Sequence, residues 1–259
     1  MRAGAELTVD PDAHVTRVER VGDEVEIDYR GPEGEARTER FEYVMAATGR
    51  VPNVDKLGLE ALGLERDRRG VPHFDKRTLQ VQGSPIFIAG DAADDAPVLH
   101  EAADEGRIAG ENAARYPNVK PGLRRAALGI VFTDPQIAIV GSGFAHLGAK
   151  HVAAGEVSFE DQGRSRVMLR NHGALRVYAE PLSGIFLGAE MVGPDAEHIG
   201  HLLAWALQAR MSVEQMLQMP FYHPVVEEGL RTALRDLDTH VKRAREAALA
   251  GEEARAAAV

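Results

Sequence analysis

The chain has 259 residues, no cysteine and a formal net charge of -10 at pH 7. This length predicts one large domain or two smaller ones, and 44% hydrophobic with 27% charged residues is typical of a soluble globular protein. The acidic balance argues against nucleic-acid binding, which needs a clustered basic face. The absence of cysteine excludes disulfides, thiolate metal sites and a dithiol redox centre carried by this chain itself.

Neither a membrane span nor a signal peptide is predicted. No apolar run approaches the roughly 18 residues that a helix needs to cross a bilayer. Glu6 and Asp10 interrupt the start of the chain, where a signal peptide would be apolar. We therefore expect a cytoplasmic protein with no membrane partner and no nucleic-acid partner.

The first stretch, residues 1–52, has a strand-like pattern. Val25, Ile27 and Tyr29 alternate with acidic residues, which predicts a strand with one face in water. Residues 31–34 contain the glycines and the proline of a turn. We expect the turn to end this strand.

The run Tyr43 to Ala47 predicts a different kind of strand. It is apolar on both faces and stops at Thr48-Gly49, as a strand buried in the middle of a sheet does. A strand that is buried on both sides needs neighbours, and too few strands precede this one to supply them.

The second stretch, residues 53–120, contains another short apolar run, Ile86 to Ala89, which ends at Gly90-Asp91. A carboxylate at the end of a buried strand lies at the sheet edge where open α/β sheets bind ligands. Asp91 could therefore accept hydrogen bonds from sugar or ribitol hydroxyls. The alternative is that Asp91 caps a turn or the helix that follows.

That helix is expected to open between Pro97 and His100. Its unpaired N–H groups and positive dipole end would stabilise an anion or an electron-rich ring. Small residues recur along the helix at three-to-four spacing, and they permit close approach of a flat group or another backbone. These residues are Ala102, Gly106, Ala109 and Ala113.

The third stretch, residues 121–238, carries strands followed by helices, which predicts an α+β domain with an antiparallel sheet and flanking helices. The expected strands lie at residues 129–132, 133–141, 175–179 and 185–191. Helices are expected after Asp195, after Ser212, where Gln215 completes a capping box, and from Pro224 onwards. The apolar face of this last helix consists of Val226, Leu230, Ala233 and Leu237.

His223, Pro224 and Glu228 are the second candidate site. Pro224 fixes the start of the helix, and Glu228 is close enough in sequence to accept a hydrogen bond from the ring of His223. A carboxylate that holds one tautomer makes the other ring nitrogen a general base near neutral pH. The alternative is a histidine before a helix that donates to a backbone carbonyl.

Two further patterns are interpreted as structural. His198 and His201 lie three residues apart without the order or the third ligand of a zinc site, so we expect a solvated helix face and no metal. The arginine pairs at residues 68–69 and 124–125 stand among acidic residues and predict solvated loops.

Five blocks in order resemble the flavoprotein disulfide reductases, with the dihydrolipoyl dehydrogenases the most similar. The resemblance runs from about residue 14 to residue 238 and matches the C-terminal portion of that family. The blocks are residues 47–53, 86–91, 99–106, 132–135 and 223–228.

The resemblance implies a flavin site. Thr48 and Gly49 would end the NAD-binding domain near the flavin, and Gly90 with Asp91 would bind the ribitol of FAD. The helix from about Val98 would point its N-terminus at the flavin, where negative charge on the reduced ring is stabilised. The implied cofactors are FAD and NAD, and the remaining cofactor contacts are Leu99 and His100.

The resemblance also implies a catalytic base and a homodimer. His223 and Glu228 would act across a dimer interface on the redox-active thiol of the other subunit, with a lipoyl-bearing protein as the substrate. The implied domains are the end of the NAD-binding domain (1–52), the C-terminal segment of the FAD-binding domain (53–120), the interface domain (121–238) and a charged helical tail broken at Gly251 (239–259).

Three family features are missing from the chain: the FAD fingerprint, the redox-active cysteine pair and the glycine-rich NAD loop. Without them, the chain alone is expected to be inactive. Three alternatives stay open. The parent could be a glutathione-type reductase, the chain could be a dimerisation module without enzymatic activity, or a separate chain could supply the missing half.

Overall fold

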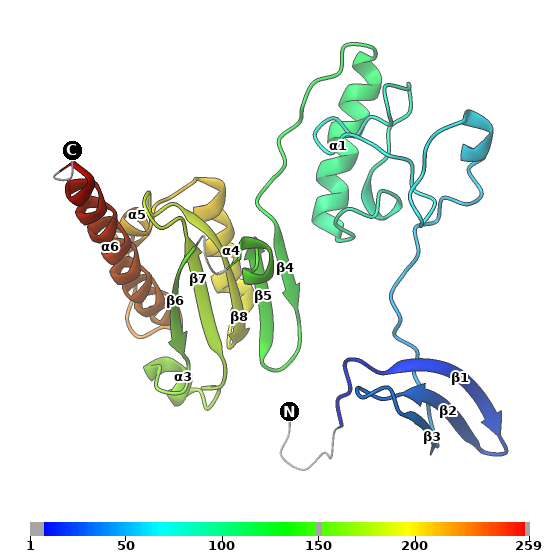
Figure 1. Cartoon of the computed structure of the whole chain (residues 1–259), viewed down its shortest axis with the longest axis horizontal. Helices are drawn as coiled ribbons and strands as arrows, with labels where there is room; N and C mark the ends of the chain where they lie inside the picture. The colour runs from blue at the N-terminus through cyan, green and yellow to red at the C-terminus, as the bar shows by residue number, and fades with distance from the viewer. Residues whose placement is uncertain (1–7, 149–151, 257–259) are drawn as a thin grey trace. The chain divides into compact units, whose positions relative to one another are not determined.

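The computed structural model describes residues 8–148 and 152–256. The chain divides into two compact units, an N-terminal unit (Arg2–Arg124) and a C-terminal unit (Arg125–Val259), which Figure 1 colours from blue to red. Each unit is described by itself.

The N-terminal unit begins with a three-stranded antiparallel sheet of order β1-β2-β3. The strands are β1 (His14–Val21), β2 (Glu24–Arg30) and β3 (Ala36–Phe41). β2 is the strand that alternation predicts around Val25, and the predicted turn follows it, closed by a 2.9 Å hydrogen bond from Gly31 N to Glu35 O. The strand and the turn are present as predicted, but the face with Val25, Ile27 and Tyr29 is only half-buried, like the acidic residues between them.

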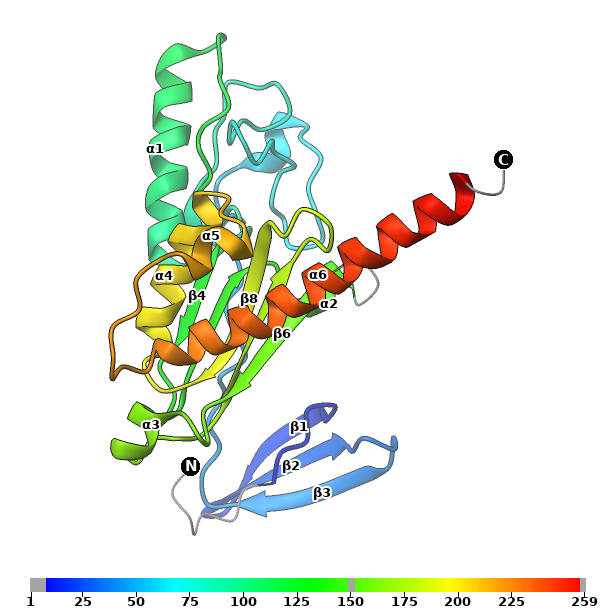
Figure 2. The same ribbon diagram turned by 90° about the vertical axis from the view of Figure 1, so that its left-hand side faces the viewer.

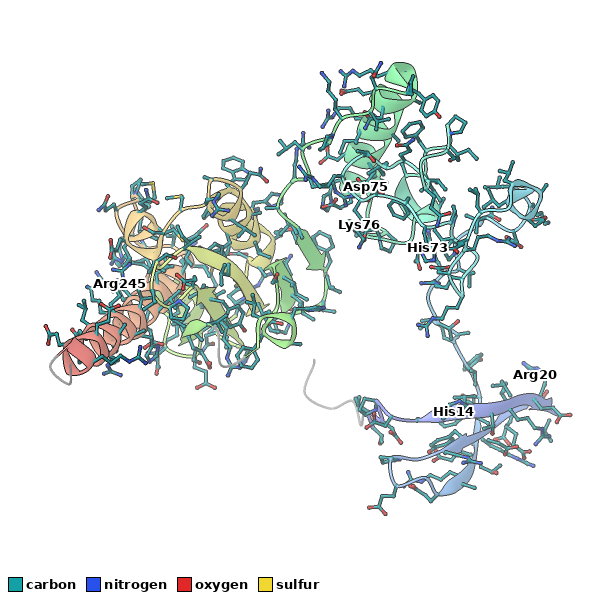
Figure 3. The ribbon with its side chains drawn as sticks, turned by 45° about the horizontal axis from the view of Figure 1, so that its top comes forward. His14, Arg20, His73, Asp75, Lys76 and Arg245 are labelled. Carbon is teal, nitrogen blue, oxygen red and sulfur yellow. The ribbon has the colours of Figure 1, made fainter. Side chains whose placement is uncertain are left out.

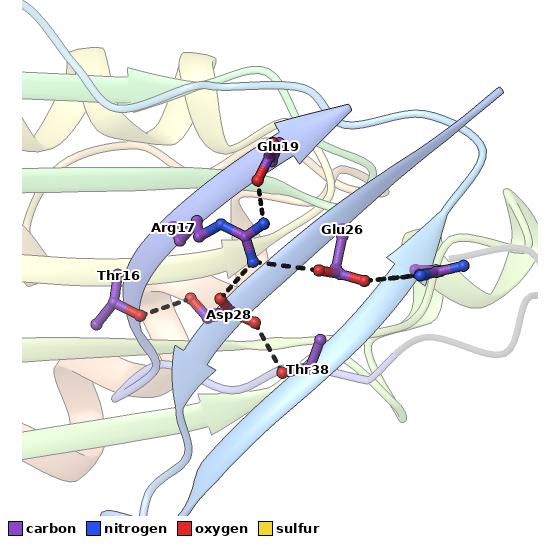
Figure 4. A network of polar contacts seen from close by, with 7 residues as sticks. Thr16, Arg17, Glu19, Glu26, Asp28 and Thr38 are labelled. Carbon is purple, nitrogen blue, oxygen red and sulfur yellow. Dashed lines mark hydrogen bonds and ion pairs between the residues drawn. The ribbon is translucent and has the colours of Figure 1, made fainter. Parts of the chain in front are cut away.

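Polar side chains connect the three strands on one face of this sheet (Figure 4). Arg17 of β1 pairs with Asp28 at 3.0 Å and with Glu26 at 3.2 Å, and Thr38 of β3 donates to Asp28 at 2.7 Å. In β1, β2 and β3 no residue is fully buried. The register therefore depends on backbone pairing and exposed ion pairs, which contribute little each.

The predicted buried strand from Tyr43 to Ala47 is absent, and this prediction is wrong. Tyr43 and Met45 are 87% and 89% exposed, and the backbone from residue 44 to 52 forms neither helix nor strand. A run that is apolar on both faces becomes a strand only where neighbours pair with its edges and cover its faces. No described strand pairs with it.

The rest of the N-terminal unit is mostly irregular chain packed on one helix. Its helical elements are η1 (Leu59–Leu62), η2 (Gly90–Ala92) and α1 (Leu99–Arg115). The run Ile86 to Ala89 contributes only an isolated bridge between Gln80 and Phe87 rather than a strand. Two small clusters of buried side chains hold this region, one around Val81 and one around Ile108.

The C-terminal unit is an α+β domain, as predicted. Its antiparallel sheet has the order β4-β5-β8-β7-β6. The strands are β4 (Leu128–Val131), β5 (Gln136–Gly141), β6 (Ala153–Ser158), β7 (Ala174–Ala179) and β8 (Phe186–Gly193). The helices are α2 (Phe144–Leu147), α3 (Gly163–Val167), α4 (Ala196–Gln208), α5 (Val213–Leu217) and α6 (Glu228–Ala256).

Helices α4 and α6 pack on the sheet, α4 against β5 and β8 and α6 against β6 and β7. Figure 2 shows α6 crossing the strands. The two layers approach closely at Gly155, where an added Cβ would lie 2.4 Å from Ala233 O of α6. One continuous core includes the predicted apolar residues Leu230, Ala233 and Leu237 of α6, together with Val226 just before the helix.

Two details of α6 differ from the predictions. The regular helix begins at Glu228 rather than at Pro224, because the residues between them form turns, with Gly229 N bonded to Val226 O at 2.9 Å. The helix also continues through Gly251. A glycine costs a helix about 1 kcal/mol relative to alanine, and the alanines, glutamates and arginine around Gly251 favour helix enough to offset it.

Arg245 fixes the middle of α6 to the body of the unit (Figure 3). Its guanidinium donates to Leu182 O at 2.7 Å, to Ser183 O at 3.0 Å and to Glu214 of α5 at 2.7 Å. The Ser212–Gln215 capping box that starts α5 is present, as predicted.

Candidate functional site

His223 and Glu228 form a hydrogen-bonded pair at the start of α6. The His223 Nδ1 atom lies 2.9 Å from both carboxylate oxygens of Glu228. The histidine side chain is 80% exposed, whereas that of Glu228 is 21% exposed. The ring is therefore held at Nδ1 by a partly buried carboxylate while the side chain is open to the surface.

Glu228 is held by more than the histidine. Its Oε2 atom also accepts a hydrogen bond from Val225 N at 3.3 Å, and Arg231 lies 4.0 Å from Oε1. The hydrogen bond from His223 is the main cause that lowers the pKa of the Glu228 carboxyl below its ordinary value, with the Val225 amide adding to it. The carboxylate stays ionised at neutral pH and favours the tautomer with the proton on Nδ1.

A surface hollow of about 500 Å³ adjoins this pair. Its other walls come from α3 and its N-cap residue, which contribute Gln162, Arg164 and Val167, and from Thr232 of α6. The strand β6 and helix α3 that bring this wall to His223 were not predicted from the sequence. Gln162 as an N-cap is a weak sequence signal, because glutamine is not among the favoured capping residues.

Gly90 and Asp91 lie on η2, in the N-terminal unit. Asp91 is 57% exposed and 3.8 Å from Arg50, and both line a hollow of about 620 Å³. Gly90 has a φ of +66°, and an added Cβ would lie 3.1 Å from Ala102 Cβ of α1. A glycine is required here, because both the backbone conformation and the contact with α1 disfavour a side chain.

The start of α1 matches the predicted position. Val98 precedes the helix without a capping side chain, and Leu99 and His100 are exposed. Thr48 and Gly49 are exposed and do not line the hollow, whose wall is formed instead by residues 50–53.

The sequence patterns do not predict a buried acidic cluster next to η2. Glu105 of α1 is fully buried and accepts a hydrogen bond from Gly90 N at 2.7 Å. Arg124 lies 3.0 Å from Glu105 and 3.3 Å from both Asp95 and Glu101. The prediction that residues 124–125 form a solvated loop is therefore wrong for Arg124, because three carboxylates that lie well before it in the sequence surround its guanidinium.

The loop before this cluster is also fixed to α1. Asp75 and Lys76 begin it (Figure 3), Lys76 pairs with Asp95 at 2.5 Å, and Asn112 of α1 donates to Thr78 O at 3.0 Å. Backbone amides, Thr78 N first, lower the pKa of Asp75.

An apolar surface, the Trp205 face, lies over α4 and the chain before α6. We define it as Leu202, Trp205, Met219 and Tyr222, which line a hollow of about 570 Å³. Trp205 is 73% exposed. A contiguous exposed apolar surface of this kind is typical of a protein interface.

Two sequence-based exclusions concern metals and membranes. Over the described residues, the structure has no group of three or more potential ligands placed to hold a metal ion. The same residues include no helix long and apolar enough to pass through a bilayer.

The fold and these positions place the chain in a class, and the comparisons with known proteins agree. Residues 128–234 match the pyridine nucleotide-disulphide oxidoreductase dimerisation domain, and residues 3–106 match the pyridine nucleotide-disulphide oxidoreductase family. The chain belongs to the pyridine nucleotide-disulphide oxidoreductases, the flavoprotein disulfide reductases that the sequence resembles.

Among its relatives, a dihydrolipoyl dehydrogenase of Haloferax volcanii is 33% identical over 204 residues, which are 78% of this chain and 42% of the relative. The dihydrolipoyl dehydrogenase of Geobacillus stearothermophilus is 31% identical over 75% of this chain and 41% of its own length. A mercuric reductase of Acidithiobacillus ferrooxidans is 30% identical over 81% of this chain and 38% of its own length. The chain thus spans less than half the length of these relatives.

Solved structures show the same fold. LpdA from Mycobacterium tuberculosis superposes with a TM-score of 0.74 and 27% identity, over 87% of this chain and 48% of its own. The HOCl-induced flavoprotein disulfide reductase RclA from Escherichia coli, at 21% identity and a TM-score of 0.70, supports the fold alone, over 86% of this chain and 51% of its own.

Proposed function

We propose that this chain is the part of a dihydrolipoyl dehydrogenase-like enzyme that supplies the catalytic base, one side of the flavin site and the dimer interface. The observation that carries the proposal is the His223–Glu228 pair, an exposed imidazole bonded at Nδ1 to a carboxylate, on a domain of the dimerisation family. The whole reaction would oxidise dihydrolipoamide with NAD.

The base would work through the Nε2 atom of His223. Glu228 holds the Nδ1 proton, so Nε2 carries the lone pair and takes a proton from a thiol, leaving a thiolate. The imidazolium that forms is stabilised by the same carboxylate. Because this chain has no cysteine, the thiol belongs to another polypeptide or to the substrate.

The flavin side would use Gly90, Asp91 and the start of α1. The exposed Asp91 carboxylate fits a role in accepting hydrogen bonds from ribitol hydroxyls, and the uncapped N–H groups after Val98 fit a site for developing negative charge. FAD, when bound, would supply the ring that passes electrons between dithiol and NAD. Thr48, Gly49, Leu99 and His100 are its remaining proposed contacts.

The dimer would form over the Trp205 face, with a second copy of the chain as the occupant. These residues lie inside the segment that matches a dimerisation domain. A Trp205→Glu change should convert a dimer into a monomer in gel filtration, while Leu249→Glu on the exposed end of α6 should not. A dimer that survives Trp205→Glu would contradict this assignment.

A chimeric enzyme tests the proposed function. The portion of the Haloferax volcanii relative outside the matched segment is joined to this chain, and NADH-linked lipoamide reduction is measured. His223→Gln should lower kcat by about 100- to 10,000-fold while flavin absorbance is retained. Retained flavin absorbance would show that the lower kcat comes from loss of the base and not from loss of the cofactor. A fully active His223→Gln chimera would contradict the proposal.

The substrate and the isolated chain are tested separately. Glutathione disulfide in the same assay distinguishes the glutathione-type alternative from the lipoamide one. The chain alone, mixed with FAD, should show no lipoamide activity, because it has no thiol of its own.

A dimerisation module without enzymatic activity is the second candidate. The observation in its favour is that the C-terminal unit has its own continuous core. A stable dimer without flavin affinity, together with an inactive chimera, would support it. A cytoplasmic location and a lipoyl-bearing protein partner stay predictions.

A further inference from the structure

Gln162 connects two segments of the C-terminal unit that are far apart in sequence. Its side-chain oxygen accepts a hydrogen bond from Ser165 N at 2.7 Å, which caps α3, and its side-chain nitrogen donates to Val225 O at 2.8 Å. Gln162 is half-buried. One amide side chain therefore joins the start of α3 to the turn between His223 and α6.

The peptide groups of Val225 transmit this contact to the proposed base. The Val225 carbonyl accepts from Gln162, and its N–H donates to Glu228 Oε2 at 3.3 Å. Glu228 in turn accepts from His223 Nδ1 at 2.9 Å. Three consecutive hydrogen bonds thus run from Gln162 to the imidazole.

We propose that Gln162 is a positioning residue for the His223–Glu228 base. It acts by holding the Val225 backbone so that its N–H points at the Glu228 carboxylate. The role of the base rests on the proposed function, whereas the contact chain rests on the geometry alone. Without Gln162 the turn is held less firmly, Glu228 moves, and the imidazole is released from the Nδ1–H tautomer.

The side chain must both donate and accept at this distance. Glutamate keeps the oxygen that caps α3 but has no N–H for Val225 O when ionised. Methionine has a similar length and offers no comparable donor or acceptor. Comparing the two separates the loss of the donor from the loss of the cap.

Asn171 provides a matched control. Its side-chain nitrogen donates to a backbone carbonyl, Glu160 O, at 2.9 Å, in the same part of the unit. It has no recorded bond to Val225 or Glu228 among the described contacts. Asn171→Met therefore removes a bond of the same kind without touching the proposed chain of contacts.

The experiment reads the tautomer of His223 in the full chain with ¹⁵N-labelled histidine. The parent chain should show protonated Nδ1, and Gln162→Glu and Gln162→Met should both shift His223 toward the Nε2–H tautomer. Asn171→Met should leave the spectrum unchanged. Circular dichroism checks that each variant is folded, and Gln162→Glu, which keeps the cap, provides the test if Gln162→Met is not folded.

Parent-like His223 resonances in a folded Gln162→Glu chain would overturn the proposal. In the chimera, Gln162→Glu should lower kcat by about 10- to 100-fold with little change in KM, since only the base is displaced. If Gln162→Glu shifts the tautomer but His223→Gln leaves activity intact, the proposed function fails and the positioning role stands. If His223→Gln lowers activity but Gln162→Glu changes neither activity nor the His223 tautomer, the positioning role of Gln162 fails and the proposed function stands.

Discussion

The two units of the chain differ in how their side chains are covered. In the C-terminal unit, one continuous core joins all of β5 to β8 with α4, α5 and α6. In the described part of the N-terminal unit, the buried apolar side chains fall into two small clusters, and the residues of β1, β2 and β3 are exposed or half-buried. A sequence pattern that predicts a helix or strand therefore forms a buried element where the described chain supplies the residues that cover it. Where those residues are not among the described ones, the apolar side chains stay exposed.

Leu237→Ala should give the largest effect on stability. Leu237 is fully buried and packs on Gly155, so its truncation leaves a cavity in the core and should lower the free energy of unfolding of the C-terminal unit by about 2–5 kcal/mol. Urea denaturation followed by Trp205 fluorescence measures this. Leu249→Ala on the same helix, at a 60% exposed position, should change stability by less than about 0.5 kcal/mol.

Glu105→Ala should have a smaller effect, and it should be confined to the N-terminal unit. It removes the acceptor of Gly90 N and one of three carboxylates around Arg124, at an expected cost of about 1–3 kcal/mol. Faster amide exchange at Gly90, with an unchanged C-terminal unit, is the expected readout. Glu111→Ala, which removes an exposed pair on the same helix, is the control, and equal effects of the two variants would contradict the buried role of Glu105.

Ser212→Ala should cost about 1 kcal/mol, because it removes the side-chain acceptor of the α5 capping box. The loss should appear in the C-terminal unit as a shift of the urea midpoint with an unchanged slope. Gln215→Ala should cost a similar or smaller amount, since it removes the reciprocal half of the same box. No shift in either variant would show that α5 is held by its packing alone.

The smallest effect is a pH dependence that differs between the units. The pKa of Glu228 is lowered chiefly by His223, and that of Asp75 chiefly by the backbone amide of Thr78. Each lowered pKa stabilises the folded state at a pH above the ordinary carboxyl pKa. This stabilisation is lost as the pH falls through the lowered pKa. In a ¹³C-carboxyl titration, His223→Ala should raise the pKa of Glu228 toward its ordinary value and leave the pKa of Asp75 unchanged. A change in both pKa values would contradict the assigned causes.

The sequence predicts what depends on local pattern and on short separations. Alternation around Val25, the capping box at Ser212 and the apolar face of α6 are all local, and each is present. The His223–Glu228 bond joins residues five apart, which is why a motif could predict it. The roles assigned to these residues stay predictions.

Three features could not be predicted, because they depend on contacts between distant residues. Arg124 forms ion pairs with carboxylates on other segments, and Gln162 donates a hydrogen bond to Val225, which lies 63 residues further along the chain. The pairing of β7 with β8 is irregular between Tyr178 and Ala179, and Phe186, which pairs with Ala179, is fully buried. Periodicity carries no information on such shifts.

The exposed end of α6 has a practical consequence in a protein without thiols. A cysteine introduced at Leu249 would be the sole target for a maleimide or nitroxide reagent. Because α6 is continuous from Glu228 to Ala256 and fixed at Arg245, a spin label at Leu249 would report the distance between the two copies of the proposed dimer by electron paramagnetic resonance. The label would lie at the other end of the helix from the imidazole of His223.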